Sequence, residues 1–249
     1  MRGVPLIVVL TACSAPPTPI SPAPVPPAPA TSSTPETLWD RGTFVVIDKE
    51  FVLPDTEETF EIFRTDDGYR FAVRFKRPAP TGELSDGQVT LHTDRRFVPL
   101  QGTMTSTIHY KGRDEITRST IAREPDGRLS TEVTASNGEK EANRSTGRND
   151  WYIGGTITSF LVALCQADES FSAPIVYPDK ITSLAPAKPL PIDGSTRAVT
   201  YRVLEYQQSR RKVIAACEDG KLAGEVARGT TIVRKGDVEL ARTLEKWFR

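Results

Sequence analysis

Two histidines and three cysteines are the side chains whose types point most directly to chemistry in this chain. His92 and His109 both fall on polar positions of predicted strands. Imidazoles on neighbouring strands can bind a metal ion together with a carboxylate such as Asp94 or Asp114. No local ligand spacing supports such a site, so we favour the interpretation that both histidines face solvent, and we predict neither a metal nor a cofactor.

The sequence patterns that usually accompany catalysis are missing. The chain contains no Gly-x-Ser-x-Gly elbow, no His-Glu-x-x-His pair and no glycine loop that would hold a phosphate. Acidic residues are abundant, but they fall mostly in turns and on strand faces, so no glycosidase pair can be nominated. We therefore expect a protein that is not an enzyme, with a hydrolase as the least favoured alternative.

The third cysteine, Cys13, closes a short segment with the layout of a secretory signal. Arg2 precedes an apolar run over residues 4–10, and small residues stand directly before the cysteine. The tetrapeptide Leu10-Thr11-Ala12-Cys13 resembles the lipobox of bacterial lipoproteins. That resemblance implies that residues 1–12 are a signal peptide and that Cys13 becomes the lipidated, usually acylated, first residue. The apolar run is too short for a transmembrane helix, which needs about 20 such residues.

A proline-rich segment follows the predicted lipidation site. Residues 14–35 hold nine prolines among Ala, Ser and Thr, without a charge in the stretch that precedes Glu36. Such a composition cannot bury a core and favours extended polyproline II. At about 3.1 Å per residue, the segment can hold a domain up to roughly 65 Å from its anchor. We therefore expect a disordered linker over 13–38 and a single β-rich domain over 39–249.

The charge of the chain is balanced, with 32 basic and 32 acidic residues. A near-neutral chain has no global field to attract nucleic acid or anionic lipid, which argues against either as a main partner. The lipobox resemblance instead implies attachment to a membrane of the cell envelope, facing the periplasm or the exterior. The sequence does not decide between inner and outer membrane, nor does it give the oligomeric state.

Hydrophobic residues in the domain recur mainly with a period of two. In Tyr69–Lys76 the odd positions are aromatic or apolar and the even ones mostly basic, as in a strand buried on one face. Weaker alternation predicts strands over 44–53, 59–64, 88–93, 105–110, 129–134 and 198–204. Asn-Gly and Asp-Gly pairs between them suit tight hairpins. The fold class is therefore mainly β with minor α, an antiparallel meander that forms a curved sheet, half-barrel or barrel.

Two segments have helical periodicity instead. Apolar residues recur at helical spacing over 157–165, and a second amphipathic stretch follows Asp237, which can cap a short C-terminal helix. Between them, the proline-rich residues 172–194 predict a mostly irregular crossing. This crossing divides a first section of sheet from a second section over 196–235.

A meander with one apolar helix in a lipoprotein resembles the half-barrel folds of bacterial envelope lipoproteins, including the lipoprotein-carrier type. The resemblance implies an apolar cavity with the helix 157–165 as its lid, and a protein that binds or carries an apolar or lipid-like ligand. The same residues form a solid core equally well, which would favour a non-catalytic structural or interaction module. The candidate cavity residues are Phe71, Val73, Phe75, Val89, Leu91, Ile108, Tyr110, Phe160, Leu161 and Leu164.

The strongest local concentration of positive charge is a basic row made by Arg70, Arg74, Lys76 and Arg77, with Arg64 nearby. Such a row can bind an anionic headgroup or a phosphate. We favour the simpler interpretation, in which the basic row is the solvent-exposed face of a strand, and this strand pairs with a neighbour that carries Glu57, Glu58 and Glu61.

Cys165 and Cys217 are the two thiols that remain after lipidation of Cys13. Cys165 ends the apolar stripe of the predicted helix, and Cys217 lies in an apolar run, 213–217, that predicts a buried strand. An exported domain permits oxidation, so a disulfide between the two is predicted. The alternative is that both are separate buried cysteines that act as small hydrophobes.

Overall fold

The computed structural model describes residues 36–48, 51–78, 82–144, 151–152, 157–166, 175–177, 179–206, 212–227 and 230–248. Side chains are described for all of these except 143, 151–152, 157–161, 175–177, 179–184 and 206. The described residues belong to one compact unit, Thr34–Arg249. The predicted signal segment, Cys13 and the proline-rich stretch up to residue 35 lie outside them.

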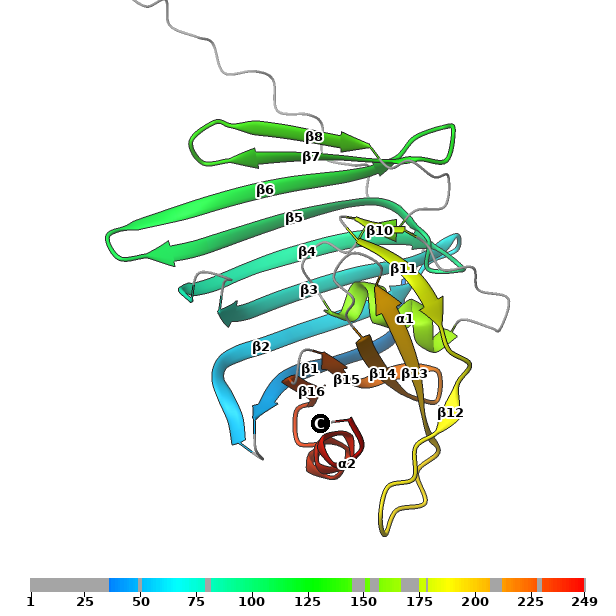
Figure 1. Cartoon of the computed structure of the whole chain (residues 1–249). Coiled ribbons are helices and arrows are strands. Elements are labelled where there is room, and N and C mark those ends of the chain that lie inside the picture. Colours follow the sequence, from blue (N-terminus) through cyan, green and yellow to red (C-terminus); the bar gives the residue numbers. More distant parts are fainter. Residues whose placement is uncertain are drawn as a thin grey trace, which may run out of the picture. The chain divides into compact units, whose positions relative to one another are not determined.

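The described strands and helices follow one another from β1 to α2 (Figure 1). In chain order they are β1 (Thr37–Asp48), β2 (Phe51–Arg64), β3 (Gly68–Pro78), β4 (Leu84–Asp94), β5 (Pro99–Tyr110), β6 (Arg113–Arg123), β7 (Leu129–Ala135), β8 (Lys140–Arg144), β9 (Trp151–Tyr152), α1 (Ile157–Gln166), β10 (Ile175–Tyr177), β11 (Asp179–Leu184), β12 (Lys188–Pro189), β13 (Val199–Tyr206), β14 (Lys212–Glu218), β15 (Lys221–Ala227), β16 (Thr230–Arg234) and α2 (Val238–Phe248).

The strands form a sheet in the order β8-β7-β6-β5-β4-β3-β2-β1-β16-β15-β14-β13-β11-β10-β9, with β12 beside β13. The first and last strands pair with each other in the middle, where Phe44 lies opposite Arg234. Neighbours are antiparallel except β9 and β10, which are parallel. Within the described part of the chain, β8 and β9 stand at the two ends of this order and do not pair with each other, so the sheet is open. These features confirm the mainly β, antiparallel meander with two helices.

Two apolar clusters lie on opposite faces of the sheet. Leu164 of α1 packs with Phe44 in one cluster, and Leu240 of α2 packs with Val45 in the other. Because successive strand residues point to opposite faces, the adjacent Phe44 and Val45 show that α1 and α2 cover different sides. We call the side covered by α1 the inner face and the side covered by α2 the outer face.

The C-terminal section of the sheet is buried from both sides. Five successive residues of β14 are buried, with Val213 and Ala215 in the inner cluster and Ile214 and Ala216 in the outer one. This explains why the sequence of β14 is a continuous apolar run rather than an alternating one.

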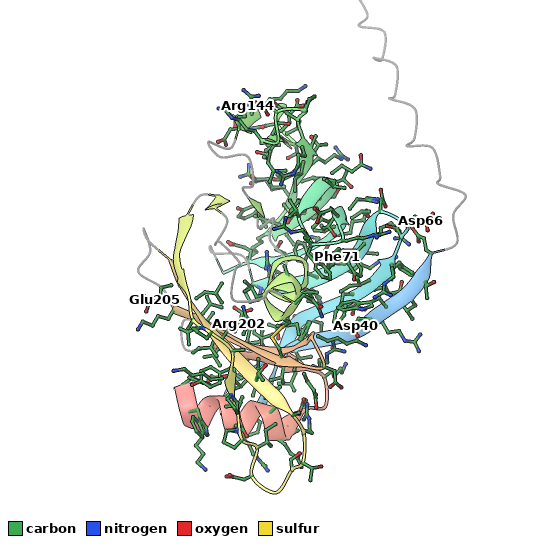
Figure 2. The ribbon with its side chains drawn as sticks, turned by 90° about the vertical axis from the view of Figure 1, so that its right-hand side faces the viewer. Asp40, Asp66, Phe71, Arg144, Arg202 and Glu205 are labelled. Carbon is green, nitrogen blue, oxygen red and sulfur yellow. A yellow bond between two sulfur atoms is a disulfide. The ribbon has the colours of Figure 1, made fainter. Side chains whose placement is uncertain are left out.

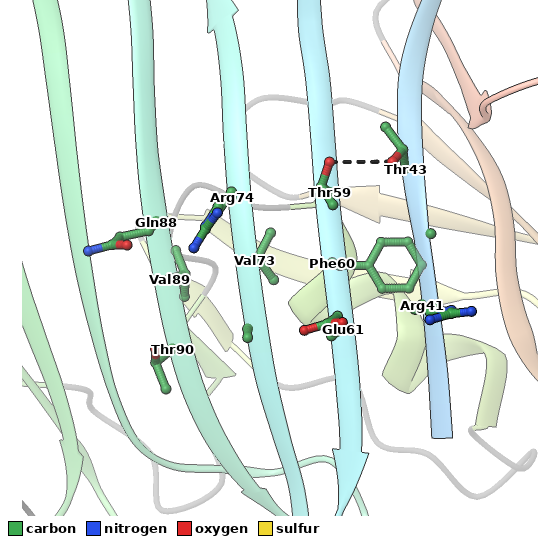
Figure 3. A pocket seen from close by; sticks show the side chains of 12 residues that line it. Arg41, Thr43, Thr59, Phe60, Glu61, Val73, Arg74, Gln88, Val89 and Thr90 are labelled. Atoms are coloured by element: carbon green, nitrogen blue, oxygen red, sulfur yellow. Dashed lines mark hydrogen bonds between the residues drawn. The ribbon is translucent and has the colours of Figure 1, made fainter. Parts of the chain in front are cut away.

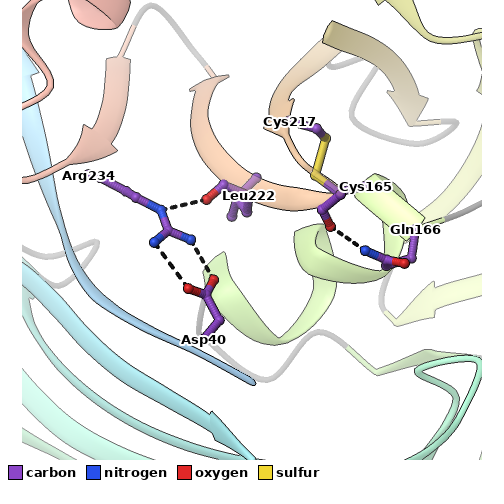
Figure 4. Close-up of a disulfide and its surroundings, with 7 residues drawn as sticks. Asp40, Cys165, Gln166, Cys217, Leu222 and Arg234 are labelled. Atoms are coloured by element: carbon purple, nitrogen blue, oxygen red, sulfur yellow. Dashed lines mark hydrogen bonds and ion pairs between the residues drawn. A yellow bond between two sulfur atoms is a disulfide. The ribbon is translucent and has the colours of Figure 1, made fainter. Parts of the chain in front are cut away.

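A disulfide joins Cys165, at the end of α1, to Cys217 of β14, with Cα atoms 5.5 Å apart (Figure 4). Beside it, the amide of Gln166 donates to the backbone carbonyl of Gly220 at 2.5 Å. Gly220 has φ +71°, and a Cβ there would lie 2.4 Å from the Gln166 amide nitrogen, so only glycine suits this turn. The disulfide therefore attaches the C-terminal end of α1 to the sheet.

An ion pair between a buried aspartate and a half-buried arginine connects strands from the two ends of the chain. Asp40 of β1 accepts hydrogen bonds from Arg234 of β16 at 2.5 and 3.2 Å, and Arg234 Nε donates to the carbonyl of Leu222 of β15 at 2.9 Å (Figure 4). The side chain of Asp40 is only 5% exposed. This network holds β1, β16 and β15 together where the ends of the chain meet.

Two expectations about secondary structure are corrected. The predicted strand 44–53 is divided, because β1 ends at Asp48 and β2 begins at Phe51, directly opposite it. Asp48 and Phe51 face each other and so share a face although they are three positions apart, which means that one alternation of period two cannot run through 44–53. The segment 172–194, expected to be mostly irregular, contains β10, β11 and β12. Among the described residues, no helix is long and apolar enough to cross a membrane.

Candidate functional site

The residues that the sequence assigned to an apolar cavity lie on the inner face. Five of them are at most 5% exposed, namely Phe71, Val73, Phe75, Val89 and Leu91. They belong to the same cluster as Val162, Ala163 and Leu164 of α1, and Figure 2 shows Phe71 beside this helix. At this place the inner face is therefore a packed core, and the disulfide fixes the covering helix to it.

The remaining cavity candidates are placed differently. Ile108 and Tyr110 are half-buried on β5, where they continue the inner face beyond the packed core, and Ile108 lies opposite the buried Ser85. The guanidinium of Arg113 lies 5.6 Å from the centre of the Tyr110 ring. The side chains of Phe160 and Leu161 lie outside the described residues.

A groove of about 730 Å³ crosses the middle of β1 to β4 (Figure 3). Its lining residues are Arg41, Gly42, Thr43, Thr59, Phe60, Glu61, Ala72, Val73, Arg74, Gln88, Val89 and Thr90. The residues that alternate with the buried Phe60, Val73 and Val89 point to the outer face. The groove is therefore lined on that face by charged and hydrogen-bonding side chains.

The strand register arranges these polar side chains in two rows across the strands. Thr43, Thr59, Arg74 and Gln88 follow one another in one row, and the hydroxyls of Thr43 and Thr59 are 3.3 Å apart. Neighbouring strands lie about 4.8 Å apart, so the side chains of one row stand side by side.

The second row explains why the surface is hollow. It runs from Arg41 through Glu61 and Ala72 to Thr90. Ala72 lies between Glu61 and Thr90, and its methyl group leaves the backbone of β3 accessible between longer neighbours. Arg41, Glu61 and Thr90 are exposed, so their polar atoms are available to a ligand.

The two histidines do not come together. His109 lies opposite Leu84 on β4, which is eight residues, or about 26 Å, from His92 along the strand. His109 Nε2 is 2.6 Å from Asp86, and Nδ1 is 3.0 Å from Asp114. Hydrogen bonds to these two carboxylates raise the pKa of His109. Among the described residues no group of side chains could hold a metal ion.

The basic row is divided between the two faces. Arg70, Arg74 and Lys76 point outward, whereas the alternation of β3 places Arg77 on the inner side with Phe75. β3 does pair with the strand that carries the expected glutamates, and Lys76 lies opposite Glu57. The ion pairs differ from the expectation, because Lys76 pairs with Asp55 and Arg70 pairs with Glu36. The Arg70 guanidinium lowers the pKa of Glu36, and burial together with Arg70 lowers the pKa of His92.

A carboxyl group is buried on the inner face, away from the groove. Glu225 of β15 lies between Ala215 and Ile232 on its neighbouring strands, both members of the inner cluster. Burial, with a smaller contribution from Glu58, raises the pKa of Glu225 to about 8. Glu225 therefore carries a proton at neutral pH, because ionisation in this apolar environment would be costly.

Comparison with known proteins gives little beyond the fold. No family model matches the chain, and no curated protein matches it either. The chain is similar to a crystal structure described as a beta-barrel-like protein of domain of unknown function DUF1849 from Brucella abortus. The match covers 81% of this chain and 95% of the Brucella chain, with a TM-score of 0.46 and 11% sequence identity. A likeness this low supports no statement about function.

The groove was not predicted from the sequence. Its outward residues were visible as the polar positions of alternating strands, which usually face solvent. Only the row formed by Arg41, Glu61, Ala72 and Thr90 across four strands makes a hollow, and this row depends on the register between strands.

Proposed function

We propose that the chain is a membrane-anchored envelope lipoprotein whose β domain is a non-catalytic binding module, with the groove over β1 to β4 as its binding face. The observation that carries this proposal is the groove itself, a hollow of about 730 Å³ on a face with hydrogen-bonding side chains. Pockets of this size accommodate small molecules or a short segment of a polymer.

The lining favours binding over catalysis. It contains two guanidinium groups, Arg41 and Arg74, one carboxylate, Glu61, and the amide and hydroxyl groups of glutamine and threonine. It contains no histidine, cysteine, serine or lysine, so the usual pairs of nucleophile and base are not present in the groove. A polar ligand that accepts hydrogen bonds from both arginines and donates one to Glu61 fits this arrangement.

The membrane anchor in this proposal rests on Leu10-Thr11-Ala12-Cys13 and on the proline-rich linker behind it. Thioether-linked diacylglycerol with a further acyl chain holds a protein firmly on a membrane, whereas a single chain binds only marginally. Labelled fatty acid should be incorporated at Cys13, and Cys13→Ser should lose the label and leave the membrane fraction.

Native mass spectrometry of the acylated protein, extracted gently from envelopes, tests the binding role. A bound polar compound should be released in Arg41→Ala and Arg74→Ala and retained in Arg118→Ala. Arg118 is the matched control, because it is exposed on the outer face of β6, beyond the groove. Retention of the compound in all three variants would contradict the assignment of the groove.

A second function, carriage of an apolar or lipid-like ligand, is favoured by one observation. Ile108 and Tyr110 extend the apolar inner face onto β5, where they are only half-buried. The same mass spectrometry distinguishes the two functions. A co-purified lipid that is lost in Ile108→Ser and kept in Arg41→Ala would favour the carrier over the polar binding module.

A further inference from the structure

The tip of the β1–β2 hairpin exposes three consecutive large apolar residues. Phe51 is 75% exposed, Val52 is 54% exposed and Leu53 is 36% exposed. We call Phe51, Val52 and Leu53 the apolar tip. Single exposed hydrophobic residues are ordinary on protein surfaces, but a contiguous exposed group usually marks a contact with a partner or a membrane.

The backbone next to the apolar tip is held by specific interactions. Val45 pairs with Glu57, but Ile47 already pairs with Val52, so β2 has three extra residues here, which form an irregular bulge. The Thr56 hydroxyl donates to the carbonyl of Leu53 at 2.6 Å, which closes the bulge. The apolar tip is thus presented on a bent but hydrogen-bonded support.

Two ion pairs lie beside the apolar tip among the described residues. Asp55, which has φ +57°, forms an ion pair with Lys76 on β3, and Glu57 forms one with Lys235 at 2.8 Å. Among the described residues beside the apolar tip, Lys76 and Lys235 are therefore each neutralised by a carboxylate and do not add positive charge that would attract anionic headgroups. A contact made by the apolar tip is therefore expected to depend on apolar burial and to be insensitive to salt.

We propose that the apolar tip inserts into the interface of the membrane to which the protein is anchored. The proposal rests on the anchored state described above. The linker joins β1 at Thr37, and the apolar tip stands at the other end of this strand, about 36 Å away. Because the linker can extend to roughly 65 Å, it is long enough for the apolar tip to reach the same bilayer.

Insertion of the apolar tip and the lipid at Cys13 would attach the protein at two points. A short apolar segment alone binds a bilayer weakly, but a tether converts its insertion into an intramolecular step with a high effective concentration. The apolar tip would then point toward the membrane, and the orientation of the domain would be set by two attachment points instead of by the linker alone.

Quenching by brominated lipid tests this contact without depending on acylation. The mature chain from Ser14, with a hexahistidine tag in place of Cys13, is attached to vesicles that contain nickel-chelating lipid. Phe51→Trp reports on the apolar tip, and Leu38→Trp is the matched control. Leu38 is 43% exposed, but it lies at the opposite end of the same hairpin, paired with Phe63.

We expect bromine on the acyl chains to quench the added emission of Phe51→Trp and not that of Leu38→Trp, at low and high salt alike. Adding Val52→Ser to Phe51→Trp should lower the ratio of inserted to free tip roughly tenfold, because one buried valine is lost. No quenching, or equal quenching at both positions, would overturn the insertion.

Self-association is the competing use of the apolar tip. Sedimentation of the tagged chain without vesicles measures it. A dimer that disappears in Phe51→Ser, together with no lipid quenching, would assign the apolar tip to a second copy and refute our proposal. Absence of fatty acid from Cys13 would refute the anchor instead, so the two failures are distinguishable.

Discussion

Replacing Glu225 with glutamine should stabilise the domain at alkaline pH, and the size of the effect follows from its environment. Burial raises the pKa of Glu225 from 4.5 to about 8. Below pH 4.5 the carboxyl is protonated in both the folded and unfolded states and contributes no pH dependence. Between the two pKa values the unfolded state ionises while the folded state stays protonated, so stability falls as pH rises.

The magnitude follows from this interval of pKa values. Each pKa unit corresponds to 1.36 kcal/mol, so Glu225 should lower the free energy of unfolding by roughly 3–5 kcal/mol when the pH rises from 4.5 to 8. Glu225→Gln keeps the shape of the side chain and removes its titration. Its free energy of unfolding, relative to that of the parent protein, should therefore rise by this amount between pH 4.5 and pH 8.

Urea denaturation followed by tryptophan fluorescence measures this difference at each pH. Glu239→Gln is a suitable control, because Glu239 is exposed on α2 and should show no comparable trend. A difference between Glu225→Gln and the parent protein that stays constant from pH 4.5 to 8 would refute the reasoning, since it would show that Glu225 ionises normally in the folded state.

Three further predictions concern covalent and ionic links. Replacing Cys165 and Cys217 together with serine should lower the free energy of unfolding by about 4 kcal/mol, because the bond closes a loop over a sequence separation of 52 residues; free thiols counted in the unreduced, denatured parent protein should be absent. Asp40→Asn should cost about 2 kcal/mol in chemical denaturation, since it removes the charged acceptor of the hydrogen bonds from the half-buried Arg234; a loss below about 0.5 kcal/mol would contradict this role. Cys13→Ser should abolish incorporation of labelled fatty acid, and continued labelling at another residue would contradict the lipobox interpretation.

Local patterns in the sequence predicted the strands whose two faces differ sharply. In β3 the large side chains of Phe71, Val73 and Phe75 alternate with polar residues, and the strand forms as expected. In β6 the inward positions are occupied partly by Thr117 and Ser119, so the contrast between faces is weak and the strand was not predicted. Alternation reports burial on one face, not strand formation itself.

Long-range features of the candidate site could not be predicted from periodicity. The pairing of Phe44 with Arg234 joins residues that are far apart in sequence, and no local pattern specifies it. The same applies to the groove, where Arg41 and Thr90 come from β1 and β4 and meet only through the register of the strands between them. The apolar tip was overlooked for a different reason, because residues 51–53 were assigned to the predicted strand 44–53.

The position of β1 between β2 and β16 has a consequence for the order in which the chain acquires its structure. Strands β1 to β8 can pair one after another as the chain is made, since each needs only its sequence neighbour. The other edge of β1 waits for Thr230–Arg234 of β16, which follows all the other described strands in the chain. Until then an unpaired edge is exposed, and such edges can pair with other chains. Folding of this protein would therefore benefit from a chaperone that covers β1 until β16 is available.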